Sequence, residues 1–150
     1  MRAWHYTTHE ALEGIFIEGK IRRDRIYLKG EIPGVWMSTN ENWEETVRKS
    51  IRDKETSKET SALSRDALYE AGFIPIRIEI NPNKVELHDW KSHCKKIPKK
   101  IVRALESAAK EWGANPDEWR VSYNEIPVDC FLSPIERWDG QRWVEACTRG

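Results

Sequence analysis

The earliest residues in the chain that could do chemistry are His5 and the three that follow it, Tyr6, Thr7 and Thr8. A histidine on a strand can bond a ribose hydroxyl while the neighbouring backbone pairs with an amide, so this stretch is a candidate pocket wall. Two simpler interpretations compete with it. A single histidine is more often a packed or surface residue. Thr7 with Glu10 three positions later also has the spacing of a helix capping box, which accounts for Thr7 without a ligand.

A second candidate stretch carries an aromatic residue followed by hydroxyl groups. Its run Val35-Trp36-Met37-Ser38-Thr39 predicts a strand that places Trp36 just before two hydroxyl side chains. An aromatic face can stack on a flat ring, which makes Trp36 a candidate ligand contact. Core packing explains the same residue equally well.

Two carboxylates, Glu118 and Glu125, stand next to predicted strands. Glu118 opens the run 118–123, and Glu125 precedes Ile126 and Pro127. A carboxylate at a strand end can stabilise a cation-like transition state at a sugar carbon. The chain has 25 acidic residues, so a surface charge is the simpler explanation for either one.

Four lysines, Lys95, Lys96, Lys99 and Lys100, gather where the strongest predicted helix begins. Lysine at a helix N-terminus gives up favourable dipole energy, of order a few tenths of a kcal/mol. Such a run is usually a solvated face. The alternative is a surface that contacts phosphate.

Composition limits the classes of protein to consider. The 150 residues balance 25 basic against 25 acidic side chains, so overall charge does not drive nucleic-acid binding. Three cysteines without paired spacing argue against a disulfide framework, and no spacing typical of metal ligands occurs. No run approaches the roughly 20 apolar residues of a membrane span. We therefore expect a cytoplasmic protein with no metal and no membrane partner.

Apolar periodicity and turn residues predict an α+β domain with no internal repeat. Strands are predicted at 2–7, 35–38, 73–80, 118–123 and 130–138, with Asp139-Gly140 as a hairpin turn before Trp143. Helices are predicted from Thr7 to about Lys20, around Trp43, Val47 and Ile51, around 67–69, and at 98–112 before Gly113. Short extended pieces are expected at 21–33, including Arg25–Leu28, and Val85–His88 is expected to extend strand 73–80. The polar segment 53–66 predicts a solvated loop or an exposed helix end, with a mobile loop over a site as the alternative.

In their order, these pieces resemble the ADP-ribosyltransferase fold, in particular its His-Tyr-Glu branch. That branch includes diphtheria-toxin-like enzymes, poly(ADP-ribose) polymerases and DarT toxins. Its members carry a first-strand His followed within two residues by Ser or Thr, as in His5-Tyr6-Thr7. They then carry a strand of glycine, aliphatic and aromatic residues, as in Gly34–Ser38, and a Glu that opens a later strand, as at Glu118.

The last motif leaves two candidates. Tyr123-Asn124-Glu125 resembles the polymerase version, but Pro127 suits the end of a strand better than its start, so Glu118 is preferred and Glu125 stays open. Trp36 also stands where the family usually has Tyr. It can stack on a ring but cannot donate a phenolic hydrogen bond.

The resemblance implies one domain over residues 1–150, with a split mixed or antiparallel sheet and flanking helices. It implies an NAD-dependent ADP-ribosyltransferase that breaks the nicotinamide–ribose bond and transfers ADP-ribose to a macromolecular acceptor, either nucleic acid or protein. NAD is then a substrate rather than a resident cofactor. The implied NAD-binding residues are His5, Tyr6, Thr7, Trp36 and Ser38. The implied catalytic carboxylate is Glu118 or Glu125.

Two other functions stay open. The tRNA 2′-phosphotransferases share the fold and also end with a strand followed by a hydrophobic-Pro step, comparable with Ile126-Pro127. A non-catalytic nucleotide-binding or partner-binding module, with tryptophans as anchors, is a third hypothesis. The sequence does not reveal the acceptor, the oligomeric state, or a role in toxicity, defence or housekeeping.

Overall fold

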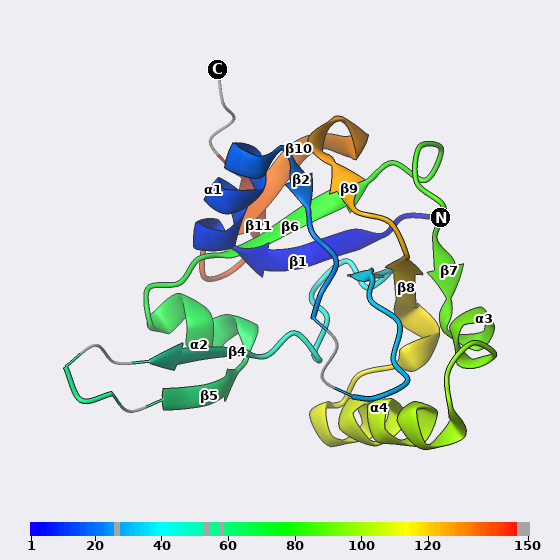
Figure 1. Cartoon of the computed structure of the whole chain (residues 1–150). Helices are drawn as coiled ribbons and strands as arrows, with labels where there is room; N and C mark the ends of the chain where they lie inside the picture. Colours follow the sequence, from blue (N-terminus) through cyan, green and yellow to red (C-terminus); the bar gives the residue numbers. More distant parts are fainter. Residues whose placement is uncertain (26–27, 53–54, 58, 147–150) are drawn as a thin grey trace.

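The central strand β1, Trp4–Thr8, carries the first candidate motif and lies between two antiparallel neighbours. It pairs along its length with β6, Pro75–Ile80, and at Trp4 with β3, Val35–Ser38. This computed structural model describes residues 1–150 except 26–27, 53–54, 58 and 147–150 (Figure 1). Among the described residues the main sheet has seven strands in the order β11-β10-β6-β1-β3-β8-β7. The α+β class predicted from the sequence is confirmed, and the strand pairs of the main sheet are antiparallel, one of the two arrangements that the resemblance implies.

The remaining elements surround this sheet. The other strands of the main sheet are β7 (His88–Asp89), β8 (Trp119–Ser122), β10 (Phe131–Trp138) and β11 (Trp143–Glu145). Two small sheets pair β2 (Lys20–Ile21) with β9 (Ile126–Pro127), and β4 (Lys49–Arg52) with β5 (Glu59–Leu63). The helices are α1 (His9–Glu18), α2 (Arg65–Glu70), α3 (Trp90–Cys94) and α4 (Lys99–Trp112), with 3-10 turns η1 (Pro116–Glu118) and η2 (Val128–Cys130). Within the described ranges, no helix is both long and apolar enough to cross a membrane.

The two faces of the sheet bury different cores, and Figure 1 shows α1 and α4 on opposite sides of β1. Side chains alternate along a strand, so Trp4 and Tyr6 share one face while Ala3, His5 and Thr7 share the other. The His5 face packs against α1 and the β2–β9 pair, in a core that includes Ile15, Ile21, Met37, Ile78 and Ile126. We call the Trp4 face the α4 face. Part of it packs against α4 through Trp119 and Ile101, and part forms a second cluster with Trp43 and Leu68.

Several predicted elements are confirmed near their expected ends. Helix α1 ends at Gly19 and α4 ends at Gly113, both in the left-handed conformation that glycine adopts without strain. The hairpin predicted at Asp139-Gly140 joins β10 to β11. Pro75 is the first residue of β6, which is the strand-start alternative of the prediction rather than the edge alternative.

Four local predictions are wrong. No helix forms around Trp43 and Val47, because side chains bond the nearby backbone there and the chain then enters β4. The segment 53–66 contains strand β5, paired with β4, which was not predicted, although its last two residues begin α2, as the helix-end alternative has it. Residues 85–88 do not extend β6; His88 begins β7 at the opposite side of the sheet, paired with β8.

The fourth error concerns Thr7. It is a buried residue of β1 paired with Ile76, and the cap position of α1 is Thr8, which makes no side-chain cap bond. The capping box therefore does not form. Part of the predicted extended piece Arg25–Leu28 lies outside the described residues.

Candidate functional site

A cavity of about 350 Å³ lies on the α4 face of the sheet, between β1, β3, β8 and α4. This volume is within the range of small-molecule sites in proteins. Three of the residues expected from the sequence line it, namely Tyr6, Trp36 and Ser38. They share a face because Trp36 and Ser38 are two apart on β3, and Ser38 pairs with Trp4, two residues before Tyr6.

Four aromatic residues contribute to the walls of the cavity. Trp4, Tyr6, Trp36 and Trp119 all line it. Trp36 meets Trp119 edge to face, with ring centroids 6.1 Å apart, and it also meets the ring of His93 edge to face at 5.0 Å. Trp36 is therefore both a core residue and a cavity wall, so the two interpretations of its sequence position are compatible.

A buried carboxylate, Glu44, belongs to this cavity and was missed by sequence reasoning. Its Oε2 accepts a hydrogen bond from Nε1 of Trp119 at 3.0 Å, and further bonds from the backbone N–H and the hydroxyl of Thr46. Glu44 is only 6% exposed. These donors hold the carboxylate in place inside an aromatic wall. No sequence signal separates it from the other acidic residues of the chain.

Two more carboxylates, Asp24 and Glu31, reach the cavity from the segment between β2 and β3. The backbone N–H of Gly34 donates to Oδ1 of Asp24 at 2.9 Å, and the N–H of Asp24 donates to the Gly34 carbonyl at 2.8 Å. These two hydrogen bonds join Asp24 to Gly34, so they hold together the two ends of the segment between β2 and β3. Partial burial raises the pKa of Asp24, and burial together with the Asp24 charge raises the pKa of Glu31.

Gly34, directly before β3, allows the segment between β2 and β3 to pass close to β8 as it enters the sheet. A Cβ added there would lie 2.6 Å from Cγ2 of Val121 and 2.9 Å from the carbonyl oxygen of Ser122, both on β8. No side chain fits that close approach of β3 to β8. The glycine of the second motif is therefore needed to position the cavity wall, independently of any ligand.

The cavity has a definite charge character. Three carboxylates and four aromatic rings line it, and none of the described lining residues is basic. Carboxylates and aromatic faces both attract cations. Arg2 and Arg77 already lie over the Trp4 ring, 4.8 and 5.5 Å from its centre. The carboxylates and the other rings suit the cavity to a flat or compact organic cation.

His5 and Thr7 do not line this cavity, because they point to the opposite face of β1. Nδ1 of His5 lies 2.9 Å from the backbone carbonyl oxygen of Trp36, a bond that requires the proton on Nδ1. His5 thus contacts the site through the backbone that carries Trp36. Tyr6 lies on the cavity side. Its hydroxyl donates to the carbonyl of Asn40, and burial raises its pKa.

Neither candidate catalytic carboxylate lines the cavity, and Glu125 lies beside the β2–β9 pair, which packs on the His5 face of the sheet. Glu118 is in η1, just before β8, and Nδ2 of Asn40 donates to its Oε1 at 3.5 Å. Asn40 also accepts the Tyr6 hydroxyl bond, so it connects Glu118 to the cavity wall. Glu125 directly precedes β9 and pairs with Lys20 at 2.9 Å. Each residue precedes a strand, so strand position does not decide between them.

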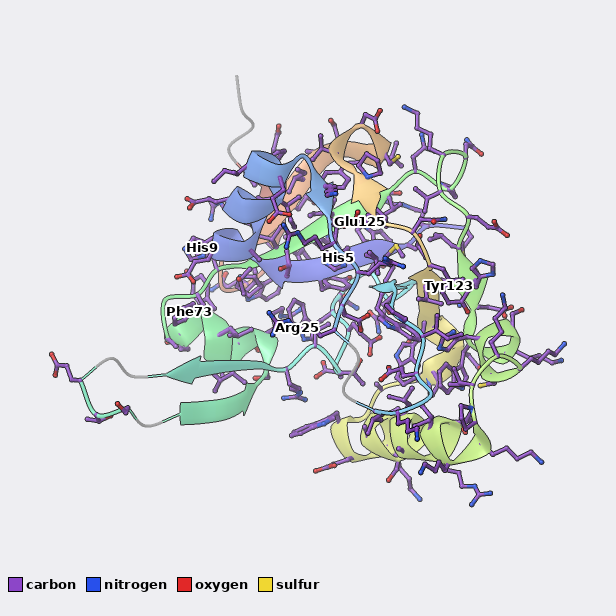
Figure 2. All side chains as sticks on the ribbon, viewed as in Figure 1. His5, His9, Arg25, Phe73, Tyr123 and Glu125 are labelled. Carbon is purple, nitrogen blue, oxygen red and sulfur yellow. The ribbon has the colours of Figure 1, made fainter. Side chains whose placement is uncertain are left out.

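The surroundings of Glu125 are basic. The hydrogen bond from Lys20, with the charges of Lys20, Arg23 and Arg22, lowers the pKa of Glu125. These residues lead directly into Asp24 at the cavity. Figure 2 labels His5 on β1, Glu125 at the start of β9 and Arg25 on the segment after β2. The exposed Arg23 and Arg25 flank Asp24 in the chain.

Comparison of the chain with protein-family models, with curated proteins and with solved structures finds no match. Outside the gaps at 26–27, 53–54, 58 and 147–150, no group of three His, Cys, Asp or Glu side chains could hold a metal ion. The interpretation of the site therefore depends on its own geometry.

Proposed function

We propose that the protein is an NAD-dependent ADP-ribosyltransferase whose cavity on the α4 face receives the nicotinamide ring. The observation that carries the proposal is the pairing of aromatic walls with carboxylates in a cavity that has no basic lining residue among those described. The nicotinamide ring of oxidised NAD is a flat cation. Aromatic faces such as Trp36 favour its shape, and Glu44 favours its charge.

The anionic part of NAD needs a different environment, and the chain supplies one beside the cavity. Arg22, Arg23 and Arg25 are exposed on the segment that delivers Asp24 to the cavity. Arginine binds phosphate oxygens through a planar set of donors. With the ring inside the cavity, the pyrophosphate extends toward these arginines. The alternation of Arg23, Asp24 and Arg25 suits a ligand that is positive at one end and negative along its length.

The chemistry follows from the movement of charge. When the nicotinamide–ribose bond breaks, the bonding electron pair leaves with nicotinamide, which becomes neutral, and positive charge develops on the ribose. A fixed carboxylate stabilises that charge more in the transition state than in the ground state. Glu44, held by Trp119 and Thr46, faces the charged ring in the cavity and so binds oxidised NAD in the ground state. Glu118, which Asn40 links to the cavity wall, or else Glu125 acts on the ribose or on the attacking acceptor group.

The experiment is to incubate the purified protein with NAD and measure release of nicotinamide, with Glu118→Ala and Glu125→Ala beside the wild type. We expect release from the wild type and its loss in one of the two variants. Glu111→Ala, an exposed change on α4, is the matched control and should keep the wild-type rate. Reduced NAD, whose ring is neutral, should compete poorly with oxidised NAD.

Three results would argue against this proposal. No nicotinamide release with nucleic-acid or protein extract present would end the transferase hypothesis. Equal binding of oxidised and reduced NAD would show that the cavity carboxylates do not sense the ring charge. A rise in melting temperature with NAD, without turnover, would favour a non-catalytic binding module.

A further inference from the structure

A second charged region lies on the outer side of α3 and of the first half of α4. Between Trp90 and Leu105 the chain has no acidic residue, and all of its lysine and arginine residues there are exposed. They are Lys91, Lys95, Lys96, Lys99, Lys100 and Arg103, which together we call the basic surface. Figure 2 shows nitrogen-tipped side chains extending outward from α3 and α4. The net charge of the whole chain is zero, so the basic surface is a local concentration of positive charge.

Apart from Lys96, which contacts the Tyr123 ring, these charges form no ion pair in the described part of the chain, and some of them are placed unfavourably. Helix α4 has no side-chain cap and no acidic residue in its first turn, so Lys99 and Lys100 stand at the positive end of the helix dipole. Lys99 and Arg103 are like charges one turn apart. Local rules are most often broken in this way where a surface serves a ligand.

We propose that the basic surface binds the phosphate backbone of a nucleic-acid strand and so presents the acceptor for the transfer reaction. That the bound strand is the acceptor rests on the proposed function, whereas binding of the strand to the basic surface does not. Lysines on a convex helical surface make point-charge contacts with phosphates, and each contact releases counterions from the strand. Recognition of this kind is independent of base sequence.

The composition of the surface favours a nucleic acid over a membrane. A helix that binds a lipid surface inserts apolar side chains between the head groups. The exposed large apolar residues of the described chain are Met1, Ile17 and Leu28, and none is on the basic surface. The apolar side of α4, including Ile101, packs inward against Trp119.

The aromatic residue beside the basic surface is not free to stack on bases. Nζ of Lys96 lies 4.9 Å from the centre of the Tyr123 ring. That ring stacks on His88 at 4.6 Å, and its hydroxyl lies 2.6 Å from Nδ1 of His93. Contact with a strand is therefore made through its phosphates.

The position of the surface suits an acceptor. Leu105 and Ala108 of α4 line the cavity, while Lys99 and Lys100 of the same helix face solvent. Lys96 contacts Tyr123, which precedes the candidate catalytic Glu125 by two residues. A strand on the basic surface thus contacts the outer side of the same helix whose inner side lines the cavity.

Binding can be tested without NAD, by fluorescence anisotropy of labelled single-stranded DNA and RNA of about 20 nucleotides. We expect binding at about 50 mM salt that weakens steeply as salt rises. Lys99→Glu/Lys100→Glu should lower affinity at least about 25-fold at 0.1 M salt and reduce the log–log salt slope by about 1.4, since each phosphate contact contributes about 0.7 on a single strand. Glutamate suits a helix N-terminus, so this variant should melt no lower than the wild type.

The control is Lys84→Glu/Lys110→Glu, which makes the same change of net charge at exposed sites outside the basic surface. It should keep nearly the wild-type slope. An equal loss in the control, or no oligonucleotide binding at low salt, would overturn the proposal. So would binding to vesicles containing anionic lipid in place of oligonucleotide. If the protein binds the strand but releases no nicotinamide from NAD, the proposal of a nucleic-acid-binding surface stands, and only the proposed transferase activity is refuted.

Discussion

Helix α4 separates two regions of opposite charge. Its inner side, through Leu105 and Ala108, closes a cavity whose charged lining residues are carboxylates, while its outer side carries Lys99, Lys100 and Arg103. The balanced charge of the whole chain conceals both regions. The difference shows how one helix can serve two ligands, since the cavity repels a polyanion that the outer surface attracts.

The two regions also differ in how firmly their charges are held. In the cavity, Trp119 and Thr46 donate hydrogen bonds to Glu44, and the Gly34 backbone donates to Asp24. Fixed charges of this kind suit transition-state stabilisation. The lysines of the basic surface have long, solvated side chains. Such charges suit binding to a backbone without sequence preference.

The largest expected effect comes from Glu44→Gln. Glutamine keeps the size of the side chain and an oxygen that accepts from Trp119, but it removes the negative charge from the cavity. At sub-saturating NAD we expect nicotinamide release to fall about 30-fold or more, because the cationic ring loses the buried charge that binds it (about 2–5 kcal/mol). Oligonucleotide binding should not change. Release at the wild-type rate would assign the stabilising charge to Glu118 or Glu125 instead.

A smaller effect is expected from Gly34→Ala. The new Cβ would be 2.6 Å from Cγ2 of Val121 and 2.9 Å from a β8 backbone oxygen, so β3 must move. Overpacking of this kind costs about 1–3 kcal/mol of unfolding free energy, measurable by urea denaturation. NAD binding should weaken as well, because β3 carries Trp36. Undiminished stability would mean that β3 and β8 are not so closely packed.

Gly14→Ala is the matched control for that experiment. Gly14 lies within α1, and an added Cβ meets nothing within 4 Å. Alanine is the better helix former, so stability should rise by about 0.5–1 kcal/mol. Both substitutions add one methyl group in place of a glycine hydrogen, but Gly34→Ala should lower the free energy of unfolding and Gly14→Ala should raise it.

Elements with local signals could be predicted from the sequence. Helix α4 has an apolar face and a terminal glycine, and the β10–β11 hairpin has Asp139-Gly140. The segment that carries Glu44 lacks such signals. Its path depends on Oδ1 of Asn40 accepting the Asn42 N–H and on Glu44 accepting the Thr46 N–H. Apolar spacing cannot reveal bonds of that kind, and it suggested a helix.

The same distinction applies to the site. Tyr6, Trp36 and Ser38 could be chosen from residue type, and the fold brings them to one cavity. His5 and Thr7 stand on the other face because strand side chains alternate, which is inherent in the strand itself. Glu44 is recognisable only from its burial. Sequence pattern thus locates strands well but does not show which carboxylate a distant tryptophan will hold.

The pH dependence of stability should differ between the two regions. Partial burial raises the pKa of Asp24 above its ordinary value of 3.8, so the stability it contributes is complete below that pH and is lost as pH rises through the raised pKa. Asparagine does not ionise, so the stability of Asp24→Asn does not fall with this titration. The stability of this variant relative to wild type should therefore increase as pH rises from about 3.8, in urea denaturation series.

Asp89, the cap of α3 beside the basic surface, should behave in the opposite way. Hydrogen bonds from Ser92 lower its pKa, so its contribution is present above its ordinary value of 3.8 and is lost as pH falls through the lowered pKa. Asp89→Asn should be destabilised most at neutral pH. Parallel trends for Asp24→Asn and Asp89→Asn would contradict the assignment of opposite environments.

The smallest effect is expected from Lys100→Glu in the absence of any ligand. The change replaces a cation by an anion at the positive end of the α4 dipole, which should raise stability by a few tenths of a kcal/mol at low salt. Lys110→Glu, in the last turn of the same helix, should lower it by a similar amount. Both shifts should shrink in about 1 M salt, where charges are screened within a few ångströms. If Lys100→Glu lowers the melting temperature, the Lys100 charge stabilises the fold. A role in ligand binding is then not needed to explain its position.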